Sequence, residues 1–288
     1  MRLLACILLG LLAVPAGAQW QKFYYEHGII KSEGMFVNGI MHGEWTFYRE
    51  NARVRSHGYY KNGVADSFWI FYDENECLTK AGYFKGGKFE GLWTFYSQEG
   101  KVRATGYYAR GMLNGLWTEY YPDGQKKYEG YFVNETKQGK FVHWHYEGYK
   151  VAEEEYKDGV LHGKHTEYYK NGIVKSEMHY KMGKLHGAWM LWYEDGKLRT
   201  QGTMKNNMKE GEWKFWGDNG KLLVKGNYRH NQYNGKWTEY DGKGQKVSEG
   251  KFYENKKKGK WIYYNEYGLI YKVEIFRNGK AIKEINYG

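Results

Sequence analysis

The stretch that decides the fold is residues 85–96, which read Lys-Gly-Gly-Lys-Phe-Glu-Gly-Leu-Trp-Thr-Phe-Tyr. Its core, Gly91-Leu92-Trp93, returns in the same phase every 24 residues, or multiples of 24, with no insertion between positions 43 and 259. A period of this length is typical of repeat architectures, in which each unit packs against its neighbours. The tryptophan of the phrase recurs at Trp45, Trp69, Trp93, Trp117, Trp189, Trp213, Trp237 and Trp261.

A second glycine keeps the same period and is followed two residues later by an aromatic residue. This column contains Gly58, Gly82, Gly106 and Gly130. Between the columns lie turn signals such as Asn171-Gly172 and Asp158-Gly159, whose residues accept a positive φ. Each unit therefore reads as two short strands joined by two turns.

The composition agrees with a β fold. Aromatic residues make up 19% of the chain and favour strands, whereas the 39 glycines leave little room for long helices. From residue 19 to the end there is room for about eleven units of 24 residues. The sequence predicts an all-β fold, an elongated single-layer antiparallel β-meander or solenoid of about eleven 24-residue β-hairpin repeats.

The recurrence of the tryptophans and of the second glycines has one explanation if each indole lies over the backbone of a glycine on the neighbouring strand. The spacing places Gly58 opposite Trp69, and Gly82 opposite Trp93, across the turn that joins their strands. A strand glycine costs roughly 0.5–1 kcal/mol relative to alanine. Burial of an indole stabilises by very roughly 4–6 kcal/mol as an upper bound. We therefore expect the tryptophans and glycines of both columns to be structural repeat residues.

The N-terminus is predicted to be a signal peptide covering residues 1–18. Arg2 precedes an apolar run over residues 3–14, and Ala16-Gly17-Ala18 is typical of a cleavage site before Gln19. The run is too short for a stable membrane-spanning helix, and no second apolar segment follows it. Export to the periplasm, the cell envelope or the extracellular space is therefore expected.

The rest of the chain divides by how well it keeps the repeat. Residues 19–42 are predicted to form an incomplete N-terminal repeat, and residues 43–264 the tandem array. In residues 265–288 Glu274 replaces the strand glycine, which predicts a C-terminal capping hairpin, because terminal repeats are usually atypical.

The pattern of residues 85–96, and of 157–164, resembles the MORN repeat (membrane occupation and recognition nexus), most closely its bacterial variant form. The resemblance extends over nearly the whole chain after the predicted signal peptide. It implies an open single-layer β-meander with a groove, and roles in scaffolding, dimerisation or lipid contact. Some members carry a toxin–antitoxin antitoxin label, with which a signal peptide agrees poorly. The family implies no catalytic residues and no cofactor.

Several polar residues could carry chemistry. His143 and His145 are predicted to share a strand face, and with His165 one repeat later they could hold a metal ion. We favour a structural interpretation, and predict no metal, because nothing specifies their separation. Glu153-Glu154-Glu155 is interpreted as a solvated acidic patch. His42, His162 and His186 occupy a column of mixed polar residues, which predicts a solvated turn.

No catalytic motif is found. The chain has no Gly-x-Ser-x-Gly, phosphate-binding loop or paired-cysteine zinc motif, and Cys77 has no partner at a recognisable spacing. We therefore predict no catalytic residues and no enzymatic activity.

The net charge of +11 is the clearest functional clue. Lys256-Lys257-Lys258 and Lys126-Lys127 are predicted to lie in turns or on outer strands. The first hypothesis is a non-catalytic exported scaffold that binds protein partners or an anionic membrane surface. The second is a carbohydrate- or cell-wall-binding module, for which exposed coplanar rings would be needed. Export argues against nucleic acid.

Overall fold

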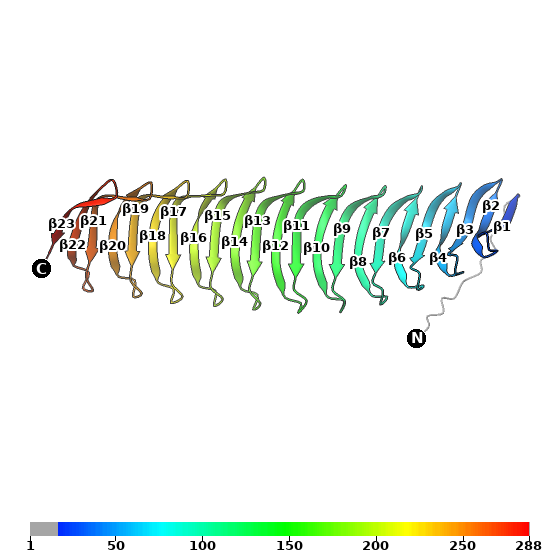
Figure 1. Ribbon diagram of the computed structural model, residues 1–288, viewed down its shortest axis with the longest axis horizontal. Helices are drawn as coiled ribbons and strands as arrows, with labels where there is room; N and C mark the ends of the chain where they lie inside the picture. Colours follow the sequence, from blue (N-terminus) through cyan, green and yellow to red (C-terminus); the bar gives the residue numbers. More distant parts are fainter. Residues whose placement is uncertain (1–16, 288) are drawn as a thin grey trace. The chain divides into compact units, whose positions relative to one another are not determined.

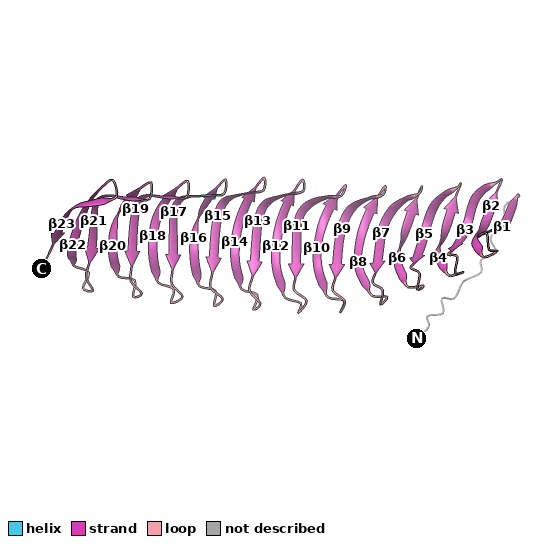
Figure 2. Ribbon diagram, viewed as in Figure 1, coloured by secondary structure: helices cyan, strands magenta, loops and turns pink. Residues whose placement is uncertain are grey.

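The computed structural model describes residues 17–287, so nearly all of the predicted signal peptide lies outside the described residues. The chain divides into two compact units, residues 1–124 and 125–288, and each is described by itself. Within the described part every regular element is a β-strand (Figure 2). It contains no helix of any kind, and so none with the length and hydropathy to cross a membrane.

In the first unit each strand pairs antiparallel with the next strand along the chain (Figure 1). The strands of this unit are β1 (Ala18–Tyr24), β2 (Ile30–Val37), β3 (Ile40–Tyr48), β4 (Val54–Lys61), β5 (Val64–Tyr72), β6 (Leu78–Lys85), β7 (Lys88–Tyr96), β8 (Val102–Ala109) and β9 (Met112–Tyr120).

The second unit repeats the arrangement with fourteen strands in its described residues. They are β10 (Lys126–Val133), β11 (Thr136–Trp144), β12 (Lys150–Lys157), β13 (Val160–Tyr168), β14 (Val174–Lys181), β15 (Lys184–Trp192), β16 (Leu198–Lys205), β17 (Met208–Trp216), β18 (Leu222–Arg229), β19 (Gln232–Tyr240), β20 (Lys246–Tyr253), β21 (Lys256–Tyr264), β22 (Ile270–Arg277) and β23 (Lys280–Asn286). The predicted all-β, single-layer antiparallel meander is confirmed in both units.

Two kinds of turn alternate along the chain. The longer turn, which we call the first turn, runs through residues 97–101 between β7 and β8, and there the Ser97 N–H donates to the Lys101 carbonyl at 2.8 Å. The second turn has two residues, such as Asn62 and Gly63, with φ of 52° and 81°. Positive φ at both central residues is the type I′ geometry of tight hairpins, which the Asn-Gly pairs predicted.

A β-bulge interrupts each hairpin, and the sequence did not reveal it. Gly82 pairs with Trp93, but the next pair is Tyr83 with Glu90, so Gly91 and Leu92 are extra residues on β7. Gly91 has a φ of 67°, a conformation that favours glycine. The residue two positions before each repeat tryptophan is therefore the bulge residue; it is glycine in every case except Ser67, which has a φ of 58°.

The side chains of each strand alternate between two faces. One face, which we call the ring face, carries the tryptophans, the bare glycines and the aromatic residue two positions after each glycine. The opposite face is called the outer face. Trp93 and Trp213 are fully buried on the ring face although each unit is a single layer, because neighbouring rings and backbone enclose them. The ring face therefore serves as the hydrophobic core.

Candidate functional site

The ring face is built from indoles that lie on glycine backbone. A Cβ atom added to Gly82 would lie 2.4 Å from Cδ2 of Trp93, so only glycine fits there. The bulge turns the Tyr83 carbonyl toward the indole, and Trp93 Nε1–H donates to it at 2.9 Å. Trp45, Trp69 and Trp261 make the same bond at 3.1 Å to the carbonyls of Met35, Tyr59 and Lys251.

The predicted repeat residues all lie on this face, but not in identical surroundings. Trp45, Trp69, Trp93, Trp213, Trp237 and Trp261 are buried, whereas Trp117 and Trp189 are half-buried. Gly58, Gly82 and Gly106 lie under Trp69, Trp93 and Trp117. Gly130 lies under Phe141 instead of a tryptophan.

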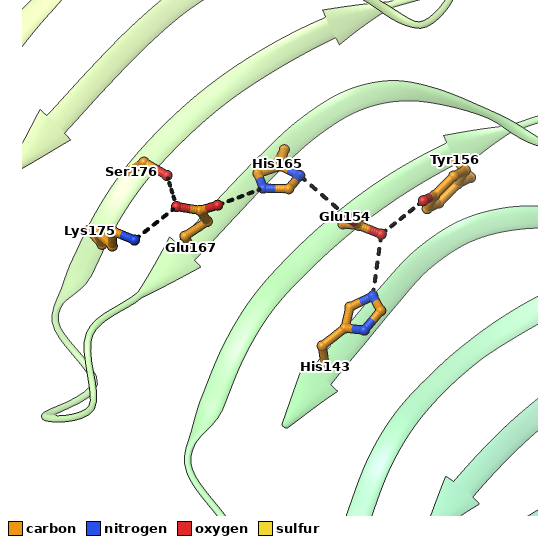
Figure 3. A network of polar contacts seen from close by, with 7 residues as sticks. All are labelled: His143, Glu154, Tyr156, His165, Glu167, Lys175 and Ser176. Atoms are coloured by element: carbon orange, nitrogen blue, oxygen red, sulfur yellow. Dashed lines mark hydrogen bonds and ion pairs between the residues drawn. The ribbon is translucent and has the colours of Figure 1, made fainter. Parts of the chain in front are cut away.

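Between β12 and β13 both members of the glycine–indole pair are replaced, whereas Gly130 loses only the indole and Trp189 lies opposite Met178 instead of a glycine. Glu154 stands where the repeat has its bare glycine, and His165 stands opposite it where the repeat has its tryptophan. Figure 3 shows the polar network that replaces the stacked pair. His143 Nε2 lies 3.3 Å from Glu154 Oε2, and the Tyr156 hydroxyl donates to the same oxygen at 2.9 Å.

His165 extends this network toward β14. Its Nδ1 lies 3.7 Å from Glu154 Oε1, and its Nε2 lies 3.8 Å from Glu167 Oε1. The Ser176 hydroxyl donates to Glu167 Oε2 at 3.1 Å, and Lys175 Nζ lies 3.6 Å from the same oxygen. His165 therefore lies between two carboxylates at ion-pair rather than hydrogen-bond distance, and its buried Nδ1 has no hydrogen-bond partner in the described part of the chain.

The hypothetical three-histidine metal site does not form. His145 follows the end of β11, where the register shifts, and its ring stacks on Tyr149 at 4.6 Å between centroids. The prediction that His143 and His145 share a face is wrong for this reason. Over residues 17–287 no group of three His, Cys, Asp or Glu side chains could hold a metal ion.

The acidic run was also interpreted wrongly in part. Glu154 is not solvated surface, because it lies on the ring face within the network. Glu153 points the other way and forms ion pairs with Lys140 at 2.7 Å and with Lys150. Glu155 accepts a hydrogen bond from the Lys164 backbone N–H at 3.0 Å. Each of the three carboxylates therefore has a different partner.

The network holds Glu154 ionised. The hydrogen bond from His143 is the largest influence, and it lowers the pKa of Glu154 from 4.5 to about 2 against the opposing effect of burial. Burial, followed by the hydrogen bond to Glu154, raises the pKa of Tyr156 to about 12. The arrangement therefore stabilises the ionised form of the Glu154 carboxylate.

Replacement of Glu154 by glutamine should change how stability depends on pH. Because the pKa is depressed in the folded state, the carboxylate stabilises the fold above about pH 4.5 and loses this effect as the pH falls toward about 2. After discounting for solvent screening we expect Glu154→Gln to lower the free energy of unfolding by about 1–2 kcal/mol at pH 7. Urea unfolding should show that the difference in free energy of unfolding between wild type and Glu154→Gln is smaller at pH 3 than at pH 7.

The matched control is Glu155→Gln, a neighbour on the same strand whose side chain faces the other way. It should follow the wild-type pH profile. A constant gap between wild type and Glu154→Gln at both pH values would contradict the proposed ion pairing.

Lysine ammonium groups cover the rings at several points. Lys80 Nζ lies 4.8 Å from the centroid of Phe71 and 5.1 Å from that of Phe89. Lys209 Nζ lies 4.6 Å from the centroid of Trp213. Burial lowers the pKa of both lysines, and no carboxylate of the described chain forms an ion pair with either. Cation–π attraction is therefore their main compensation for lost hydration.

The two lysine clusters singled out from the sequence lie in strands. Lys256-Lys257-Lys258 opens β21, and Lys126-Lys127 opens β10. Lys257 belongs to the ring face, with Nζ 4.1 Å from the centroid of Trp261, so the prediction of turns or outer strands is wrong for it. The alternation of side chains along β21 is the reason.

The polar column of His42, His162 and His186 is part of the strands rather than a solvated turn. Several side chains of this column accept hydrogen bonds from the second turn of the next hairpin, whereas His186 Nδ1 lies 3.4 Å from the Asn206 side-chain oxygen, which can only accept. His162 Nδ1 accepts from the Met182 backbone N–H at 3.4 Å, and Glu90 Oε2 accepts from that of Arg110 at 2.9 Å. Histidine, glutamate and glutamine all accept such a bond in this column, which explains part of its tolerance of different residue types.

A row of cations lines the second turns of the unit 125–288. All its members are exposed, and none forms an ion pair with a described residue. The row comprises Lys157, Lys181, Lys184, Lys205, Arg229, Lys256, Arg277 and Lys280. We call it the basic edge. Three acidic residues also lie in the second turns of this unit: Glu135, Asp158 and Glu254.

These features are those of a β-repeat protein in which the rings of each unit pack against one another without a second layer, and in which the basic edge is exposed. A family model described as the MORN repeat variant matches six segments, residues 21–38, 89–110, 113–134, 161–182, 185–206 and 209–230. The chain is a MORN-repeat protein, and the resemblance noted from its sequence is confirmed. Such repeats are generally binding modules without catalytic activity.

Comparison with curated proteins and solved structures gives no further information on the function. No curated protein matches the chain. A crystal structure of TcdB2-TccC3-Cdc42 shares 10% identity over 95% of this chain and 19% of that chain, with a TM-score of 0.20. The Tc holotoxin pore of Photorhabdus luminescens shares 11% identity over 89% of this chain and 14% of that chain, also with a TM-score of 0.20. The chain thus spans less than a fifth of these structures.

Proposed function

We infer that the protein is an exported, non-catalytic scaffold whose unit 125–288 binds an anionic membrane surface through the basic edge. The predicted signal peptide supports export, and the binding character of MORN repeats supports a scaffold. The single observation that carries the membrane proposal is the row of exposed cations without carboxylate partners.

The geometry of the edge suits a flat anionic surface. Successive second turns of this unit emerge from every second strand, and strands are about 4.8 Å apart, so the cations recur about every 10 Å. Each Lys or Arg near an anionic bilayer contributes about 1 kcal/mol. Apolar side chains in or next to the same turns are also exposed: Val160, Met182 and Tyr253 are 45%, 75% and 49% exposed. Cations mixed with exposed apolar side chains are typical of interfacial binding.

The carbohydrate hypothesis is less well supported. Sugar stacking needs exposed, coplanar rings, but six of the eight repeat tryptophans are buried on the ring face. On the outer face the exposed rings of Phe68 and Tyr83 are tilted by 59°. The repeat tryptophans, which would be the natural platform for sugar stacking, are therefore mostly not accessible to a sugar.

Vesicle binding tests the proposal. The protein should sediment with vesicles that contain about 30% phosphatidylserine and not with phosphatidylcholine alone, and salt should weaken binding. Lys181→Glu/Lys205→Glu changes the edge by four charges and should weaken binding at least tenfold, since each lost cation costs about 1 kcal/mol.

The matched control makes the same change in net charge at the first turns, which lie at the opposite ends of the strands from the basic edge. Lys221 and Lys243 are exposed in first turns, and no ion pair joins either to a described residue. Lys221→Glu/Lys243→Glu should bind within about threefold of wild type. Equal losses in the two variants would show that net charge, not the edge, governs binding and would refute the proposed site.

A further inference from the structure

A cleft in the unit 125–288 lies over β19, β20 and β21, on the outer face. Its volume is about 730 Å³, which is within the range of sites for small ligands. The charged residues that line it are Lys236, Lys251, Lys258 and Lys260, together with one carboxylate, Glu249. The lining therefore carries a surplus of three positive charges.

The lysines of this cleft stand directly opposite one another across neighbouring strands. Lys251 on β20 is the Cα partner of Lys236 on β19 and also of Lys258 on β21. Like charges at such positions destabilise a sheet. The repeat does not require them, because the columns of Lys236 and Lys251 hold Lys140 and Glu155, an oppositely charged pair, in an earlier repeat. Local choices that cost stability are expected at functional sites.

Most of the positive charge in the cleft is not neutralised within the fold. Glu249 is already shared between Lys236 and Lys246, whose Nζ atoms each lie 3.3 Å from its Oε2. The other three lysines of the lining are exposed, and no carboxylate of the described chain forms an ion pair with them. Their ammonium groups are therefore available to an anionic ligand.

Lys258 has no structural role that would explain its charge. It stands in the polar column in which Glu90 and His162 accept a hydrogen bond from the next second turn, and an ammonium group can only donate. Its Nζ lies 5.0 Å from the ring centroid of Tyr253, which is 49% exposed and also lines the cleft. Lys258 thus contributes charge to the cleft instead of a bond to the fold.

We propose that this cleft binds an acidic oligosaccharide that carries a carboxylate or sulfate group on each sugar. Neighbouring strands are about 4.8 Å apart, close to the length of one sugar unit, so successive anionic groups meet Lys236, Lys251 and Lys258 in turn. Recognition rests on charge and not on ring stacking, so it does not need exposed repeat tryptophans. The site is separate from the basic edge, whose cations lie at the second turns and do not line the cleft.

Other anions fit the row of lysines less well. An extended acidic peptide repeats the carboxylates of one side about every 6.6 Å, which does not match the spacing of the strands. A single phosphate or sulfate ion cannot reach both ends of a row that spans three strands, or about 10 Å. A bilayer surface is flat and does not enter a cleft.

Calorimetric titration of the chain from Gln19 to Gly288 with tetragalacturonate, which has one carboxylate on each sugar, tests the site. We expect a Kd of about 100 µM at about 50 mM salt, and no binding of the uncharged methyl ester of the same tetrasaccharide. Lys251→Gln/Lys260→Gln removes two unpaired cations and should weaken binding at least tenfold. Lys251→Arg/Lys260→Arg keeps the charge and should bind within about threefold of wild type.

The matched control, Lys221→Gln/Lys243→Gln, makes the same change in net charge at exposed first turns and should bind within about threefold of wild type. Circular dichroism establishes that each variant is folded. Vesicle sedimentation separates this site from the proposed membrane surface, because Lys251→Gln/Lys260→Gln leaves the basic edge intact and should sediment within about threefold of wild type.

A wild-type chain that does not bind tetragalacturonate at about 5 mM overturns the proposal, whatever the result with vesicles. Equal affinity for the methyl ester, for tetraglutamate or for tripolyphosphate would also overturn it, because the spacing of charges along a sugar chain would then not be what the cleft recognises. So would equal losses of affinity in Lys251→Gln/Lys260→Gln and in the first-turn control, since net charge alone would explain them.

Discussion

Gly202→Ala is expected to lower the free energy of unfolding by about 3–5 kcal/mol. Trp213 is fully buried, and a Cβ atom on Gly202 would lie 2.1 Å from its Cδ2 and 2.2 Å from its Cε2. These atoms belong to the rigid centre of the indole, so the ring must leave its place rather than bend. The cost is therefore close to that of losing the buried indole.

Urea unfolding followed by tryptophan fluorescence measures the effect. Gly242→Ala is the matched control in the same unit, because no atom lies within 4 Å of an added Cβ there and its φ is not in the left-handed region. It should change stability by less than about 1 kcal/mol. If Gly202→Ala unfolded at the same urea concentration as this control, the indole would not depend on bare backbone.

The sequence was sufficient to predict how Gly82 and Trp93 face each other. A two-residue turn fixes the register of a hairpin, and the 24-residue period then carries that register along the chain. It was not sufficient to predict the bulge at Gly91, because a glycine column is equally consistent with a turn, a close approach or a positive φ. Only backbone coordinates separate these causes.

Contacts between hairpins were the least predictable. The bond from the Met182 N–H to His162 joins residues 20 positions apart, and it depends on how one second turn lies beside the strand before it. The Glu154–His165 pair, by contrast, left a signal in the sequence. Both residues depart from their columns, and the pairing of Gly58 with Trp69 already places those columns opposite each other.

Restoring the repeat at this pair, by Glu154→Gly/His165→Trp, is expected to stabilise the protein by about 1–3 kcal/mol relative to wild type. The double variant recreates the arrangement of Gly202 under Trp213. Replacing a polar pair on the ring face by a packed apolar pair removes the desolvation cost of the charges. His143 and Tyr156 lose an acceptor, but both are half-buried and can reach water.

Each single change should instead destabilise by about 2–3 kcal/mol. His165→Trp alone presses an indole against the Glu154 carboxylate, and Glu154→Gly alone leaves His165, which is paired with that carboxylate at 3.7 Å, without it. A double-mutant cycle from urea unfolding at pH 7 should therefore give a coupling free energy well above the roughly 0.5 kcal/mol typical of independent sites. Additive effects would mean that the two positions do not act as one unit of the ring stack. The reverse exchange, Gly202→Glu/Trp213→His, should be less stable than wild type, since it lacks the donors that His143 and Tyr156 supply to Glu154.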